Sequence, residues 1–164
     1  MSYWRTFYHL IWSTKNREAL ITPDIEPRLF AYCVRKANEL ETMVHAINGW
    51  HDHIHMIVSV PPKVAIADLL HLVKGASSHE FKLQWQRGYG VLTLGEKQLP
   101  IAVAYVENQK THHVATSTVA ALEYVLDIDN APHYKGVSSH FSLYASPPLR
   151  EVSVMYDVTP ESYF

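Results

Sequence analysis

The sequence predicts an α+β fold in which helices cover one face of an antiparallel sheet. Segments rich in aromatic and β-branched residues alternate with segments whose apolar residues recur at helical spacing. Two of the strand-like segments, 41–50 and 53–60, are separated only by a turn signal at Gly49 and Asp52, so they should form a hairpin. The resulting order is the βαββαβ order of ferredoxin-like proteins.

The first half of the chain supplies the first three strands and one helix. Residues 3–14 are dominated by aromatic and β-branched residues and are expected to form the first strand. Thr22 is a candidate N-cap, and Pro23 then occupies the first position of a helix that runs to about Leu40. The hairpin strands follow, and the pair of prolines at 61–62 ends the second of them.

The second half is predicted to be mostly helical. A long amphipathic helix is expected over 64–86, with one stripe formed by Ile66, Leu69, Leu70, Val73 and Ser77. A short strand over 88–94 completes the sheet, and a further helix is expected over 97–113. A final helix is expected from about 116 to 127.

The composition indicates one globular domain, and the net charge is relevant to whether the protein binds nucleic acid. The chain has 164 residues, enough to bury its own core, and we expect a domain over 1–145 followed by a tail over 146–164. A single cysteine, Cys33, and the absence of any membrane-spanning apolar run favour a cytoplasmic protein without disulfides. The net charge of −2 argues mildly against a nucleic-acid partner, since phosphate binders usually carry excess lysine and arginine.

Three histidines and an aspartate gather at the turn of the predicted hairpin. His53 and His55 are two residues apart on a strand, so both side chains leave the same face of the sheet. Two such imidazoles can bind one divalent ion and leave positions open for substrate oxygens, although hydrogen-bonded histidines at a strand end give the same pattern. His51 is a turn residue or a supporting residue. Asp52 could orient a histidine, but by parity it is expected to point away.

A second group of polar residues lies on the predicted helix over 97–113. Tyr105 and Gln109 are four residues apart and therefore share a helical face, which His112 continues. An oriented tyrosine can attack phosphorus, and a glutamine amide oxygen one turn away can supply a neutral metal ligand. A core aromatic and an exposed helix former are the alternative interpretations, and His112 or His113 could replace Gln109 as the ligand.

Four segments, in order, resemble a known family of enzymes. His53 and His55, in "DHIHMIVSVPP", resemble the HUH motif, two histidines around a bulky apolar residue. The stretch "WQRGYGVLTL" followed by "AYVENQKTHH" resembles the region that carries the nucleophile in single-tyrosine HUH transposases. The segments "YHLIWSTKNR" and "LLHLVKGASSHEF" resemble that family's first strand and long helix. The family is the IS200-like transposases of small bacterial insertion sequences, with their repeat-associated domesticated relatives.

The resemblance implies a function and a role for each matched residue. His53, His55 and Gln109 would be ligands of Mg²⁺ or Mn²⁺, and Tyr105 would be the nucleophile. The reaction would cleave and rejoin single-stranded DNA near hairpins through a 5′-phosphotyrosine with a free 3′-OH. The resemblance also implies a homodimer in which the nucleophile helix of one subunit can complete the site of the other. It further implies a bacterial enzyme that acts on DNA in the cytoplasm.

Other features leave alternatives open. A second group of residues could contact DNA phosphates: Lys15, Arg17, Lys74, Ser77 and Ser78. A non-catalytic nucleic-acid-binding dimer and a domesticated nuclease would share the fold. A metal-dependent enzyme acting on small molecules would suit the net charge better.

Overall fold

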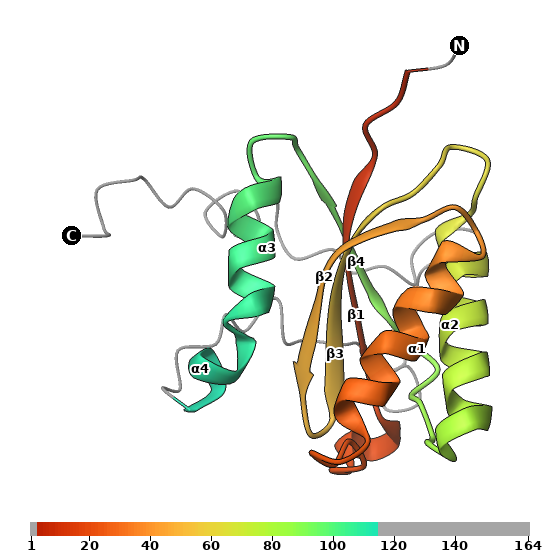
Figure 1. Cartoon of the computed structure of the whole chain (residues 1–164), viewed down its shortest axis with the longest axis vertical. Helices are drawn as coiled ribbons and strands as arrows, with labels where there is room; N and C mark the ends of the chain where they lie inside the picture. Colours follow the sequence, from red (N-terminus) through yellow and green to blue (C-terminus); the bar gives the residue numbers. More distant parts are fainter. Residues whose placement is uncertain (1–2, 115–164) are drawn as a thin grey trace, which may run out of the picture.

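The computed structural model describes residues 3–114, which form a four-stranded antiparallel sheet with helices packed on it (Figure 1). The strands are β1 (Phe7–Ser13), β2 (Met43–Trp50), β3 (His53–Ser59) and β4 (Gly90–Leu94). The helices are α1 (Glu26–Asn38), α2 (Ile66–Phe81), α3 (Leu99–Glu107) and α4 (Gln109–Val114), with a short 3-10 turn, η1 (Lys15–Arg17). The predicted βαββαβ order is therefore confirmed. The predicted helix over 116–127 and the tail over 146–164 lie outside the described residues.

The strand order is β2-β3-β1-β4, so β3 and β1 are the central strands. All neighbouring strands are antiparallel, and the predicted hairpin of β2 and β3 is present, with Trp50 opposite His53. Every residue of β3 is buried. Because both neighbours of β3 are strands and both of its faces are covered, any polar side chain on it must be satisfied inside the protein.

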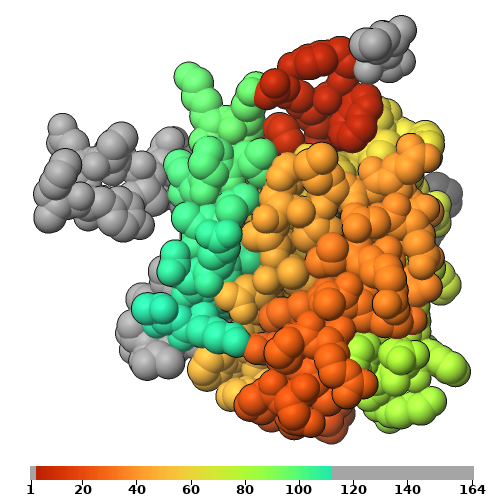
Figure 2. Space-filling model, in the orientation of Figure 1, coloured from red at the N-terminus to blue at the C-terminus, as the bar shows by residue number. Residues whose placement is uncertain are grey.

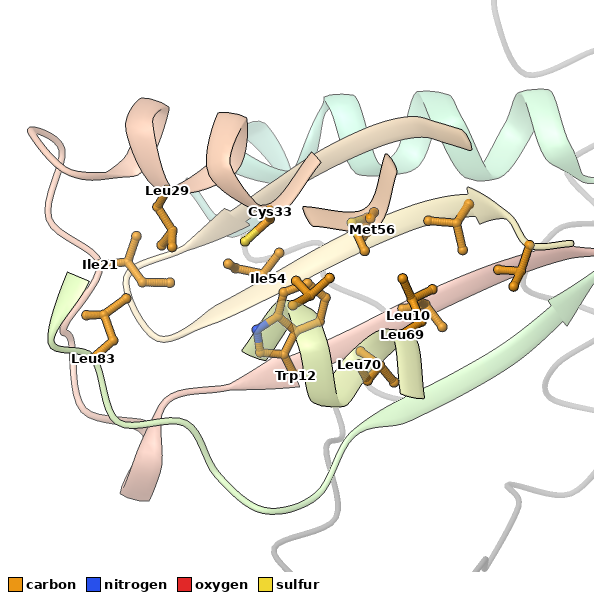
Figure 3. Packing of buried hydrophobic residues seen from close by; sticks show 14 residues of the cluster. Leu10, Trp12, Ile21, Leu29, Cys33, Ile54, Met56, Leu69, Leu70 and Leu83 are labelled. Carbon is orange, nitrogen blue, oxygen red and sulfur yellow. The ribbon is translucent and has the colours of Figure 1, made fainter. Parts of the chain in front are cut away.

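One face of the sheet carries the larger apolar core, beneath α1 and α2 (Figure 3). Leu10 and Trp12 of β1 and Ile54 and Met56 of β3 point into this core. The helices contribute Leu29, Cys33, Leu69, Leu70 and Val73. Burial raises the pKa of the Cys33 thiol to about 12, so this cysteine is a packed, neutral side chain.

The opposite face is covered by α3 and α4, which pack on β2 and β3 (Figures 1 and 2). A smaller apolar cluster lies between them and the sheet, formed by Ile11, Ala46, Ile57, Leu94, Ala102 and Val106. The prediction that helices cover one face of the sheet therefore holds for α1 and α2. The helix that follows β4 covers the other face. Among residues 3–114 no helix is long and apolar enough to cross a membrane.

Several helix boundaries differ from the predicted ones. The first helix begins at Glu26 with Ile25 at the N-cap, so the prediction of Thr22 as the N-cap is wrong; the Thr22 carbonyl accepts from the amides of Ile25 and Glu26 in the turn before the helix. The predicted helix over 64–86 ends at Phe81, where Lys82 adopts a left-handed φ of 55°. The predicted helix over 97–113 is interrupted at Asn108, whose ψ of 12° is not helical.

Two glycines give a matched test of this fold. At Gly49 a Cβ would lie 2.2 Å from the carbonyl oxygen of His53, so Gly49→Ala should lower the free energy of unfolding by about 1–3 kcal/mol. Gly75, inside α2, has no atom within 4 Å of such a Cβ, so Gly75→Ala should raise it by about 0.5–1 kcal/mol. Urea denaturation measures both changes. A Gly49→Ala protein as stable as the wild type would contradict the close approach of β2 and β3.

Candidate active site

The histidine pair on β3 faces the smaller core, under α3. His53 and His55 are both fully buried, and their ring centroids are 5.0 Å apart. Ile57 continues the same face and belongs to the smaller cluster, whereas Ile54 and Met56 belong to the larger one. The predicted alternation is confirmed, and it brings both imidazoles to one place between the sheet and α3.

Asp52 orients the first of these histidines. Its Oδ1 lies 2.6 Å from Nδ1 of His53, and its Oδ2 lies 2.8 Å from Nε of Arg17. Burial raises the pKa of the Asp52 carboxyl, but the hydrogen bond and charge of His53 and the charge of Arg17 together hold that pKa below its usual value. The expectation that Asp52 points away is wrong, because Asp52 lies in the turn before β3, where strand parity does not apply.

His9 of β1 contacts the second histidine and was missed by the sequence analysis. Its Nε2 lies 2.9 Å from Nδ1 of His55, and its ring is fully buried. The signal was available in the pattern of β1, since a histidine stands between apolar residues of a central strand. The sequence does not show, however, which residue of β3 lies beside it.

The two hydrogen bonds select one nitrogen in each ring. Nδ1 of His53 is engaged by Asp52, and Nδ1 of His55 is engaged by His9. Nε2 is therefore the nitrogen through which each imidazole can bind an ion, in the pattern typical of metal-binding histidines. Among the side chains that the structure describes, no three His, Cys, Asp or Glu residues form a group that could hold a metal ion.

Tyr105, in the last turn of α3, lies beside the rings of His55 and His9. Its ring centroid is 6.3 Å from that of His55 and 6.5 Å from that of His9, in edge-on arrangements. Tyr105 is partly buried and packs against the smaller cluster. The structure thus brings the predicted nucleophile and the predicted HUH histidines together within one chain.

Gln109, the predicted third ligand, is fully buried at the first position of α4. It does not continue the helix of Tyr105, as the spacing predicted, because the chain leaves helical geometry at Asn108. The helix α4 packs on β2 and lies beside α3, on the side of the sheet away from α1 and α2 (Figure 1). The side chains of His112 and His113 lie outside what the structure describes.

The residues predicted to contact DNA lie on two elements, η1 and α2. Lys15 is exposed in η1, and Arg17 beside it pairs with Asp52, so this turn lies at the rim of the histidine site. Lys74, Ser77 and Ser78 belong to α2, on the opposite face of the sheet.

The three α2 residues take part in internal hydrogen bonds. Nζ of Lys74 donates to the carbonyls of Gln86 and Gly88 at 2.7 and 2.9 Å. Ser77 is fully buried, donates to the Val73 carbonyl and accepts from the Trp85 indole N–H, and so presents no surface to DNA. Ser78 donates to the Leu83 carbonyl. These contacts tie the 82–89 segment to α2.

Comparison with known proteins identifies the family. The fold and site define an α+β protein in which a His-x-His pair on a central strand faces a tyrosine on a covering helix. Over residues 2–109 the chain matches the family described as "Transposase IS200 like". The match spans more than half of the chain, and the protein therefore belongs to the IS200-like transposase family.

Two curated relatives are similar over most of their length. The chain is 26% identical over 117 residues to the ISDra2 transposase TnpA of Deinococcus radiodurans, covering 62% of this chain and 82% of that protein. It is 28% identical over 120 residues to the transposase for insertion sequence element IS200 of Salmonella typhimurium, covering 65% of this chain and 78% of that protein.

Two solved structures share the fold. A putative transposase from Deinococcus radiodurans matches with a TM-score of 0.55 and 21% identity, covering 73% of this chain and 95% of that one. A REP-associated tyrosine transposase bound to a REP hairpin matches with a TM-score of 0.57 and 16% identity, covering 69% of this chain and 74% of that one. Because the sequence identities are this low, the two comparisons establish a shared fold only.

The contacts of Lys74 predict a structural effect of its removal. Lys74→Met should lower the free energy of unfolding by about 1–3 kcal/mol, because three backbone carbonyls lose a charged donor. Lys15→Met is the control, since this exposed side chain should change stability by less than about 0.5 kcal/mol. Urea denaturation measures both. Unchanged stability in Lys74→Met would leave the ammonium available for the predicted phosphate contact.

Proposed function

We propose that this protein is a metal-dependent strand transferase that cleaves and rejoins single-stranded DNA through a phosphotyrosine bond to Tyr105. The observation that carries the proposal is the position of the Tyr105 ring, 6.3 Å from that of His55, a fully buried and hydrogen-bonded imidazole. Membership of the IS200-like transposase family supports DNA as the substrate. The hairpin bound to the REP-associated relative supports a hairpin-bearing single strand.

The donor atoms of the site fit a divalent cation. Nε2 of His53, Nε2 of His55 and Oε1 of Gln109 would hold it, leaving the remaining positions for phosphate oxygens and water. Oxygen donors suit Mg²⁺ and Mn²⁺, and two imidazoles favour Mn²⁺, the softer of the two. When bound, the cation would polarise the scissile phosphate and stabilise the negative charge of the transition state.

The chemistry of Tyr105 conserves the number of phosphate ester bonds. Its Oη attacks phosphorus in line, and the bond from phosphorus to the 3′-oxygen breaks as the bond to Oη forms. The phenol loses its proton and the leaving 3′-oxygen gains one, so the products are a 5′-phosphotyrosine and a free 3′-OH. Attack by a 3′-OH on the phosphotyrosine reverses the reaction, so rejoining needs no nucleotide cofactor.

The contact between Tyr105 and His55 supports a site built within one chain. A homodimer is part of the proposal, with the cytoplasm as its location. If its subunits exchanged nucleophile helices, Tyr105 would instead serve the histidines of the partner subunit.

A covalent adduct tests the chemistry. Wild-type protein incubated with hairpin-bearing single-stranded DNA and Mn²⁺ should give a protein–DNA adduct on a denaturing gel, and EDTA should prevent it. Tyr105→Phe should lower adduct formation by about three orders of magnitude or more, because the nucleophile is lost. Tyr32→Phe is the matched control, since Tyr32 packs on Phe81 beside the other face of the sheet. An adduct that survives Tyr105→Phe would overturn the assignment, and DNA binding without an adduct would support a non-catalytic binder.

Mixing two inactive variants tests where the nucleophile acts. We expect Tyr105→Phe and His53→Ala to be inactive separately and to remain inactive when mixed and refolded together, because each chain's tyrosine serves its own histidines. Adduct formation is the measurement, and a mixture of wild type with either variant is the control for subunit exchange. Recovery of activity in the mixture of the two variants would show instead that homodimers share their active sites.

A further inference from the structure

His9 is a buried imidazole that the strand-transfer chemistry described above does not use. It lies on β1, and its Nε2 is 2.9 Å from Nδ1 of His55. Its ring is also edge-on to Tyr105, with centroids 6.5 Å apart. The residue therefore contacts one predicted metal ligand and approaches the predicted nucleophile.

We propose that His9 is a positioning residue that holds His55 in the tautomer and ring orientation needed to bind a divalent cation. This inference rests on the proposed function, because it concerns the same metal site. His55 can bind through Nε2 only if that nitrogen carries no proton, which places the proton on Nδ1. Nδ1–H of His55 then donates to Nε2 of His9, and His9 carries its own proton on Nδ1.

The pairing of the central strands fixes this hydrogen bond. His9 is opposite Ile57 and Ile11 is opposite His55, so His9 and His55 are diagonal neighbours across an antiparallel pair. Diagonal neighbours on one face lie within reach of aromatic side chains. Neither ring can move away easily, because both are fully buried in the two central strands of the sheet.

The two histidines are thus held in different ways. His53 is held by the carboxylate of Asp52, and that carboxylate also pairs with Arg17. His55 is held by the imidazole of His9 inside the sheet. Hydrogen bonds of this kind to a metal-binding histidine are worth about 10–100-fold in metal affinity.

The experiment is a titration of the full-length protein with Mn²⁺, followed by calorimetry or by the loss of the free-ion electron paramagnetic resonance signal. His9→Phe keeps a ring but removes the acceptor, and we expect it to weaken Mn²⁺ binding by about 10–100-fold. His9→Gln places an amide oxygen near the position of Nε2 and should retain most of the affinity. His45→Phe is the matched control, because His45 is a partly buried histidine that hydrogen-bonds Ser59 rather than His55. The His45→Phe protein should bind Mn²⁺ as tightly as the wild type does.

The outcomes separate this inference from the proposed function. If wild-type protein binds Mn²⁺ and His53→Ala does not, the metal site stands, and His9→Phe then decides the role of His9. Unchanged affinity in His9→Phe would overturn the positioning role, and so would equal losses in His9→Phe and His9→Gln, which would indicate packing alone. Thermal unfolding without metal shows whether each variant is folded. If wild-type protein binds no Mn²⁺, this result contradicts the proposed metal-dependent function itself, whatever the role of His9.

A second readout follows the tautomer directly. In protein labelled with ¹⁵N-histidine, long-range proton–nitrogen correlation spectra distinguish protonated Nδ1 from protonated Nε2. We expect His55 to carry its proton on Nδ1 in the wild type and in His9→Gln, and to lose this preference in His9→Phe. The same tautomer in all three proteins would overturn the proposed role.

Discussion

The burial of β3 on both faces is the constraint on which the rest of the structure depends. It lies between β2 and β1, and all of its residues are buried. Its alternate side chains enter two different cores, so one strand supplies both the apolar packing under α1 and α2 and the imidazoles under α3. Buried imidazoles must be hydrogen-bonded, and the partners that satisfy them also fix their orientation. In this fold, the same hydrogen bonds therefore satisfy the buried histidines and fix the orientation of their rings.

One partner of the histidine pair is close to it in sequence, and the other is close to it only in the folded structure. Asp52 precedes His53 directly, and the turn of the hairpin bends its carboxylate back onto the ring. His9 is 46 residues away from His55 in sequence, and only the pairing of β1 with β3 brings the two together. A loss of hairpin geometry would thus disturb the orientation of His53, while a slip in strand register would disturb that of His55.

Features that depend on residues close together in the sequence could be predicted, and features that depend on distant residues could not. The shared face of His53 and His55 was predictable, because a period of two is a local property of any strand. The ends of α2 and α3 were not, because the left-handed Lys82 and the non-helical Asn108 carry no proline or glycine signal. His9 was missed because its role depends on register between distant strands, and Asp52 was misplaced because strand parity was extended into a turn.

The end of α3, next to the interruption at Asn108, is hydrogen-bonded to the sheet. Asn48 of β2 is opposite His55 in the strand pairing, and its side-chain amide donates to the Glu107 carbonyl at 2.9 Å. Glu107 is the last residue of α3, two positions after Tyr105, and a carbonyl at a helix end has no partner within the helix. The end of α3 thus supplies the acceptor that attaches it to the strand beside His55. The position of Tyr105 beside His55 is consequently set by the hydrogen bond from the Asn48 side chain to the end of α3 and by the packing of Ala102 and Val106 of the same helix into the smaller cluster.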